Sequence, residues 1–150
     1  MNMYARFGAM IVTSTVVMLG LMYLNTYQLD HVLFSETRTY MALVMGATMA
    51  VIMLAFMLKM LTNRRVNIGI FIGSAVVFSL ALWLVRSQVA VDDVSYMRAM
   101  IPHHSIAILT SERADIADPR VRKLADKIIE TQRKEILEMK VLIKDLEDKR

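Results

Sequence analysis

Residues 40–60 read YMALVMGATMAVIMLAFMLKM, and no charged side chain occurs in this stretch before Lys59. Two further uncharged runs, residues 7–24 and 68–85, lie on either side of it. Each run is close to the roughly 20 apolar residues with which an α-helix crosses the hydrocarbon core of a membrane. The sequence therefore predicts three transmembrane helices, at about residues 7–27, 40–61 and 68–85.

The first of these runs has a second interpretation, a secretory signal peptide. Its basic end holds only Arg6, and the residues that follow the run offer no small-x-small cleavage site. We therefore expect the run to remain in the protein as a membrane helix.

Charge is distributed unevenly along the chain, which has a formal net charge of +4 and a pI near 9.5. Acidic and basic side chains balance from residue 92 onward, so the excess positive charge belongs to the membrane part and indicates no nucleic-acid partner. The loop after the second run is basic, with Arg64 and Arg65, whereas the tail begins with Asp92 and Asp93. The positive-inside rule then places the N-terminus in the cytoplasm and the tail outside.

A methionine ridge runs along the middle membrane segment, with a methionine at almost every fourth position: Met41, Met45, Met49, Met53, Met57 and Met60. Residues four apart form the ridges by which helices pack together, and methionine fills irregular gaps in such contacts. Packing is therefore the first interpretation of the ridge. The alternative is a sulfur-lined path or docking face for copper.

The tail has the pattern of a helical hairpin, with helices predicted at about residues 92–113 and 119–147. Asp118 and Pro119 are a typical N-cap and first residue of a helix. Pro102 either kinks the first of these helices or means that this helix begins later.

Two polar residues, Gln132 and Glu135, interrupt the apolar stripe of the second tail helix, and buried polar groups need partners. The first tail helix offers them. At about 100° per residue, two thioethers and two imidazoles share one of its faces, those of Met97, Met100, His103 and His104. Folding the hairpin at its turn sets this face against three residues of the second helix, Gln132, Glu135 and Met139.

A patch of histidine and methionine suits copper, because thioethers favour Cu(I) and imidazole is a common copper ligand. The chain has no cysteine, which structural zinc sites prefer, and no Glu-x-x-His motif of the kind that di-iron sites use. The alternative is that His103 and His104 are an ordinary hydrogen-bonded pair, one of them satisfied by Glu135. We expect His31, in the first loop, to be solvated.

The tail also resembles a known family, the bacterial "domain of unknown function 305" family. The residues that carry the resemblance are Asp93, Tyr96, Met100, His103, His104, Pro119, Leu124, Ala125, Ile128, Ile129, Gln132, Glu135, Ile136 and Met139. The resemblance implies a ferritin-like helical bundle and, from some members, periplasmic copper binding. Thr110 departs from the pattern, because family members usually have a methionine there. One motif copy supplies only two helices, so the resemblance implies a homodimer or higher oligomer.

We therefore expect an all-α protein with a transmembrane region at residues 1–88 and a soluble hairpin at residues 89–150, which forms a four-helix bundle by dimerisation. No catalytic triad, phosphate loop or dinucleotide fingerprint is present, so we expect no enzyme. The expected function is copper binding on the outer face of a bacterial inner membrane, with lipid and further copies of the chain as partners. The alternative is a metal-free module for oligomerisation or partner docking.

Overall fold

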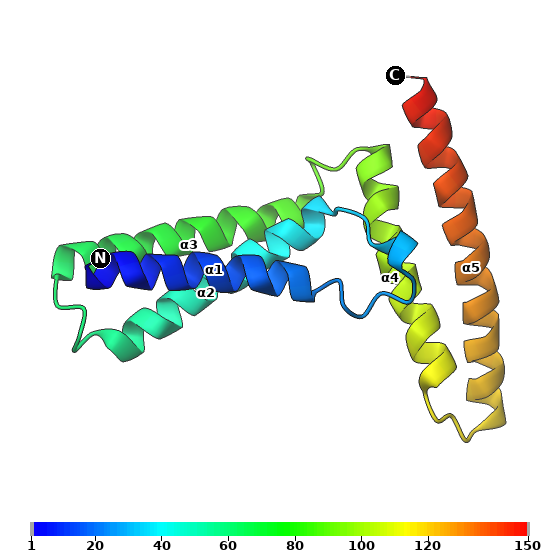
Figure 1. Ribbon diagram of the computed structural model, residues 1–150, viewed down its shortest axis with the longest axis horizontal. Coiled ribbons are helices and arrows are strands. Elements are labelled where there is room, and N and C mark those ends of the chain that lie inside the picture. The colour runs from blue at the N-terminus through cyan, green and yellow to red at the C-terminus, as the bar shows by residue number, and fades with distance from the viewer. Residues whose placement is uncertain (1, 150) are drawn as a thin grey trace. The chain divides into compact units, whose positions relative to one another are not determined.

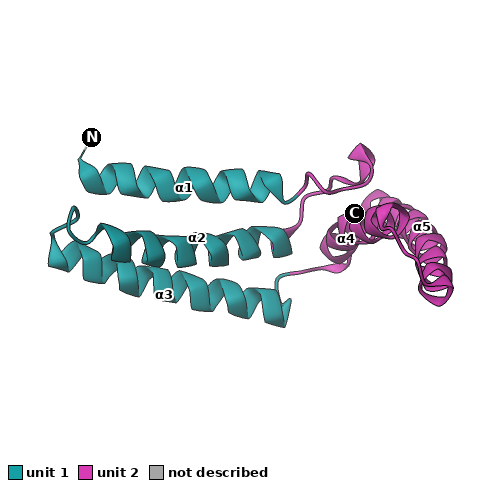
Figure 2. Ribbon diagram, turned by 90° about the horizontal axis from the view of Figure 1, so that it is seen from below, with its two compact units in different colours: residues 1–22, 37–90 teal, residues 23–36, 91–150 magenta. Residues whose placement is uncertain are grey.

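The computed structural model describes residues 2–149, and within them it is all-helical, as predicted. A short 3-10 helix, η1 (Leu29–His31), lies between the first two of five α-helices (Figure 1). The α-helices are α1 (Met3–Leu21), α2 (Glu36–Met57), α3 (Arg64–Ser87), α4 (Asp93–Arg113) and α5 (Pro119–Asp148). The chain divides into two compact units: residues 1–22 with 37–90, and residues 23–36 with 91–150 (Figure 2).

The first unit consists of α1, α2 and α3, which are all long and apolar enough to cross a membrane. Helices α2 and α3 begin four residues before the predicted positions, because polar residues form their first turns. Asn63 caps α3 by accepting hydrogen bonds from the backbone N–H groups of Arg65 and Val66. Helix α1 ends at Leu21 rather than near residue 27, since the residues after it fold with the second unit.

The apolar core of the first unit contains Phe7, Ala50 and Leu54. Met53 and Met57 of the methionine ridge pack against this core, and both are half-buried. These two methionines therefore fill space between helices, as the packing interpretation predicts.

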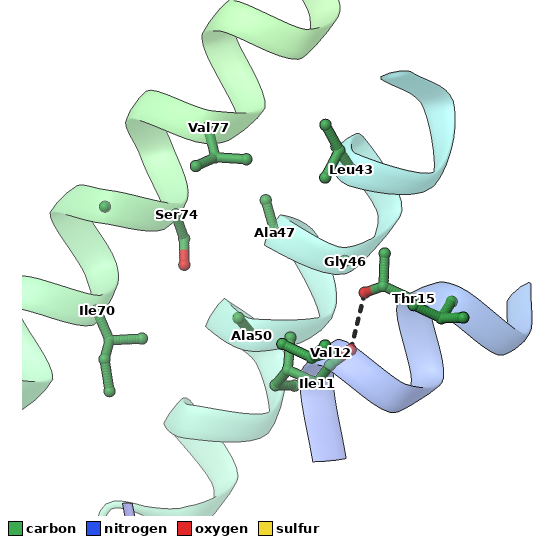
Figure 3. A pocket seen from close by; sticks show the side chains of 12 residues that line it. Ile11, Val12, Thr15, Leu43, Gly46, Ala47, Ala50, Ile70, Ser74 and Val77 are labelled. Atoms are coloured by element: carbon green, nitrogen blue, oxygen red, sulfur yellow. Dashed lines mark hydrogen bonds between the residues drawn. The ribbon is translucent and has the colours of Figure 1, made fainter. Parts of the chain in front are cut away.

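Helices α1 and α2 lie close together at Gly46 (Figure 3). Thr15 of α1 lies beside this glycine, and its hydroxyl donates a hydrogen bond to the Ile11 carbonyl of its own helix at 2.8 Å. A groove of about 480 Å³ opens beside the contact, between these helices and α3. The absence of a side chain at Gly46 thus permits close packing of two helices that are long and apolar enough to cross a membrane.

We expect the Gly46→Ala substitution to destabilise the first unit. The added Cβ would lie 2.3 Å from the Thr15 Oγ1 atom and 3.1 Å from its Cγ2 atom, so the two helices must separate. Such overpacking costs about 1–3 kcal/mol, which thermal unfolding of the detergent-solubilised protein would detect. Gly8→Ala is the matched control, because its Cβ would meet nothing within 4 Å. Equal melting temperatures for the two variants would contradict the expectation, and Thr15→Ala should partly rescue Gly46→Ala.

The second unit is built on the predicted hairpin of α4 and α5. Asp118 caps α5 by accepting from the Arg120 backbone N–H, and Pro119 occupies the first turn, as the sequence predicts. Helix α4 continues without interruption through Pro102, so the alternative of a later helix start is wrong.

The core of the second unit also contains residues from the loop at positions 23–36. Ile101, Ile108 and Ile136 form a buried cluster between the two hairpin helices, and Tyr27 and Leu33 of the loop pack against it. The division at residue 88 predicted from hydropathy therefore differs from the observed units. Hydropathy assigns a loop by its neighbours in sequence, whereas this loop buries side chains against α4 and α5.

Candidate functional site

A groove of about 650 Å³ runs along the hairpin between α4 and α5. Thioether, imidazole, carboxylate and apolar side chains line it. The lining residues are Asp93, Tyr96, Met97, Met100, His104, Glu135, Glu138, Met139, Leu142, Asp145 and Leu146. We call this the methionine groove.

His104 makes two polar contacts in the methionine groove. Its Nδ1 atom lies 3.0 Å from the Met100 carbonyl oxygen, one turn earlier in α4. Its Nε2 atom lies 2.8 Å from Oε2 of Glu135, on α5. A carbonyl can only accept a hydrogen bond, so Nδ1 carries a proton and donates it. The nitrogen that faces Glu135 and the groove is therefore Nε2.

The structure brings five of the seven predicted site residues together, because Met97, Met100, His104, Glu135 and Met139 all line the methionine groove. The other two do not line it. His103 is exposed, although its ring centroid lies 6.1 Å from that of His104. Gln132 is half-buried, and we expected α4 to satisfy it. Within residues 2–149, however, its Oε1 is the one buried side-chain polar atom without a hydrogen-bond partner.

Among the described residues, no three side chains of histidine, cysteine, aspartate or glutamate gather closely enough to hold a metal ion. The sulfur donors that line the methionine groove are the thioethers of Met97, Met100 and Met139.

The expectation that His31 is solvated is wrong, because its side chain is buried against α4. Its Nδ1 atom lies 3.0 Å from the Ser105 hydroxyl, which also accepts a hydrogen bond from the Tyr27 backbone N–H at 2.8 Å. The sequence marks Ser105 only as the neighbour of two histidines, and no pattern in it pairs residues 74 positions apart.

Two ionisable groups of the loop are affected by this packing. Burial lowers the pKa of His31, and the nearby Lys140 ammonium lowers it further. The hydrogen bond from Lys140 also lowers the pKa of Asp30, whose carboxylate lies 2.5 Å from the ammonium nitrogen. The loop is thus attached to α4 through Ser105 and to α5 through Lys140.

We expect the stability of the second unit to fall as the pH drops below about 6.5, the ordinary value for histidine. The depressed pKa means that the folded unit resists protonation of His31 while the unfolded chain accepts it. The contribution is complete above that pH and declines by at most about 1.4 kcal/mol per pH unit below it. Hydrogen exchange of α4 amides, corrected for intrinsic rates, measures the effect in the full chain. His31→Gln should flatten the profile, and an unchanged profile would contradict the assignment.

Comparison with known proteins identifies the family. Residues 86–150 match the family model described as "Domain of unknown function (DUF305)". An uncharacterised protein of Acanthamoeba polyphaga mimivirus is 33% identical over 106 residues, which are 69% of this chain and 68% of that protein. The chain belongs to the DUF305 family. No solved structure matches it.

The DUF305 match begins at the end of α3 and includes both hairpin helices, so the whole methionine groove lies within the family domain. The mimivirus relative matches over more residues than the 86–150 segment contains, so its similarity extends into the helices before that segment.

Proposed function

We propose that this protein is a membrane-anchored copper-binding protein of the bacterial inner membrane, with its DUF305 hairpin on the outer face. The observation that carries the proposal is the composition of the methionine groove, whose lining includes three thioethers and one imidazole. Thioethers favour Cu(I), and imidazole binds both oxidation states of copper. The family resemblance, which implies copper binding in some members, points to the same metal.

The hydrogen bonds of His104 fit a metal ligand. A histidine that binds a metal commonly donates its other ring N–H to a carbonyl or carboxylate, which orients the ring. Here the Met100 carbonyl holds Nδ1, and Nε2 is directed into the groove. Copper would bind at Nε2, and Met97, Met100 and Met139 would supply the softer donors. Glu135, whose Oε2 lies 2.8 Å from Nε2, would then lie beside the metal and partly balance its positive charge.

The contacts of the loop support the proposed topology. The loop and the tail are joined by hydrogen bonds from Lys140 to Asp30 and from the Tyr27 backbone to Ser105. These bonds can form only if the loop and the tail lie on the same side of a membrane. Two apolar helices, α2 and α3, separate them in sequence, so two crossings return the chain to the side of the loop. The basic loop between these helices then lies in the cytoplasm, as the positive-inside rule requires.

We expect an alkaline phosphatase fused after residue 150 to be active in a bacterial host, because the tail would be exported. A fluorescent protein that folds only in the cytoplasm should be dark at the same position. The same two fusions placed in the loop between α2 and α3 are the control and should give the opposite results. An inactive phosphatase and a bright fluorescent protein at the tail would overturn the orientation and, with it, periplasmic copper binding.

Metal analysis of the full-length protein in detergent tests the proposed function directly. Protein loaded with Cu(I) under reducing conditions and then dialysed should retain copper, whereas Zn²⁺ offered in the same way should be lost. Retention of zinc in place of copper would contradict the soft-ligand argument. A protein that retains no metal would favour the alternative function, a metal-free module for oligomerisation or docking.

A further inference from the structure

The hairpin has an open apolar face beside the methionine groove. Helix α4 covers only part of the apolar stripe of α5, so Val121, Leu124 and Leu142 remain 49%, 58% and 45% exposed. Tyr96 of α4 is 54% exposed on the same side, where it lines the groove. The loop at residues 23–36 packs on the Ser105 side of α4 and leaves this face uncovered. Exposed apolar surface of this extent commonly marks an interaction site.

The charges beside this face change sign along α5. Arg120, Lys127 and Lys134 are seven residues apart, so they follow one flank of the helix in its first half. Glu138 and Asp145 continue the same flank in the second half, and both line the methionine groove. The first half of the flank is therefore positive and the second half negative.

The ion pairs of these residues leave the flank available. Arg120 pairs with Asp118, the N-cap of α5, through two hydrogen bonds, and its own side chain is 91% exposed. Lys134 pairs with Glu130 and Asp145 with Lys149, each four residues away on the same helix and exposed. Exposed pairs of this kind contribute little, about 0.3–0.5 kcal/mol, so they can exchange partners at a small cost.

We propose that a second copy of this chain covers the open face, with its α5 antiparallel to the first. In this orientation the positive half of each flank meets the negative half of the other. Lys127 then lies opposite the partner's Glu138, and Arg120 opposite the partner's Asp145. The same register brings Ile128 to within two residues of the level of the partner's Met139, and Leu124 to within one residue of the level of the partner's Leu142. One alignment thus matches both the charges and the apolar side chains.

Other arrangements fit the face less well. A parallel pair of α5 helices would set Glu138 against the same carboxylate of the partner. Packing α5 on the partner's α4 would bring the acids of the groove close to the partner's Asp93. Like charges in contact are unfavourable, so the flank disfavours both arrangements.

The antiparallel pair would complete the methionine groove. Each copy contributes Lys127 and Arg120 to the acidic rim of the other's groove, and the partner's apolar side chains close the open side over Met100 and Met139. The statement that the second copy completes a metal site rests on the proposed function. The pairing of the two α5 helices requires no copper.

Cysteine cross-linking tests the orientation, because the chain has no cysteine of its own. Two differently tagged full-length chains, Leu124→Cys and Leu142→Cys, are mixed in detergent with a chelator and treated with a short bis-maleimide. We expect cross-links between the two variants and none within either alone. Lys123→Cys and Lys144→Cys are the matched controls, since they lie at similar heights on faces turned away, and they should not cross-link.

Charge exchange provides a second measurement. Lys127→Glu and Glu138→Lys should each weaken the dimer roughly tenfold in analytical ultracentrifugation, because each creates two like-charge contacts. The protein with both substitutions should recover the wild-type affinity. Links between Leu124→Cys chains, or single variants with unchanged affinity, would overturn the antiparallel pair.

If the protein is a monomer at all concentrations, the antiparallel pair is wrong, and a different partner covers the open apolar face. Copper retention, measured on the same samples, distinguishes the two failures. A copper-loaded monomer refutes only the pairing, and a metal-free antiparallel dimer refutes only the copper function.

Discussion

The His104→Ala protein should lose its Cu(I), whereas the His103→Ala protein should retain it. The two histidines are neighbours in sequence, but only His104 lines the methionine groove, and His103 is exposed. Removing a group that merely orients a ligand costs about 10–100-fold in metal affinity, so removal of a ligand should cost more than that. Competition titration against a Cu(I) chelator of known affinity measures the difference.

The thioethers should contribute as a group. Replacing Met97, Met100 and Met139 together by leucine keeps the volume of the groove nearly constant, and such exchanges usually cost less than about 1.5 kcal/mol in stability. We expect the triple variant to lose Cu(I) but to keep much of its Cu(II) affinity, because only the softer ion depends on sulfur. Glu135→Gln should have a smaller effect than His104→Ala, since glutamine keeps an oxygen atom beside Nε2 whereas alanine removes the imidazole ligand.

The copper assignment fails if the His104→Ala protein binds Cu(I) as tightly as the wild type. The methionine ridge of α2 would then be the next candidate, and its membrane position would predict binding only in detergent or lipid. Circular dichroism must show that the variant keeps its helices, so that loss of copper reflects loss of a ligand and not of the fold.

The Ser105→Ala protein should release the loop at residues 23–36 from the hairpin. The Ser105 side chain is fully buried, and its hydroxyl holds both the Tyr27 backbone N–H and the His31 ring. Without it, both groups remain buried and lack their partner. Each unsatisfied group costs about 1–3 kcal/mol, so the second unit should lose roughly 3 kcal/mol.

Hydrogen exchange and limited proteolysis measure this release. The amides of the loop should exchange much faster in Ser105→Ala than in the wild type. Thr110→Ala is the matched control, because its hydroxyl bonds only to backbone carbonyls of its own helix, at Ile106 and Ala107. If the loop is equally protected in both variants, then apolar contacts such as those of Leu33 are what hold it.

Much of the architecture is determined by the sequence alone, because it depends on local patterns. The long uncharged runs predict the three membrane helices, since no water is available in a bilayer to satisfy an open backbone. The pair Asp118 and Pro119 predicts the start of α5, because an N-cap side chain and a proline act within one turn. The grouping of Met97, Met100 and His104 on one face of α4 follows from helical periodicity.

Only the tertiary structure decided which groups meet across the hairpin and the loop. Periodicity places His103 and His104 in one patch, but the crossing of α4 and α5 directs only His104 to Glu135. Nothing local relates Ser105 to Tyr27 and His31, because they lie in segments that two membrane helices separate. Such contacts depend on which surfaces the folded unit buries together, and sequence spacing carries no information about that choice.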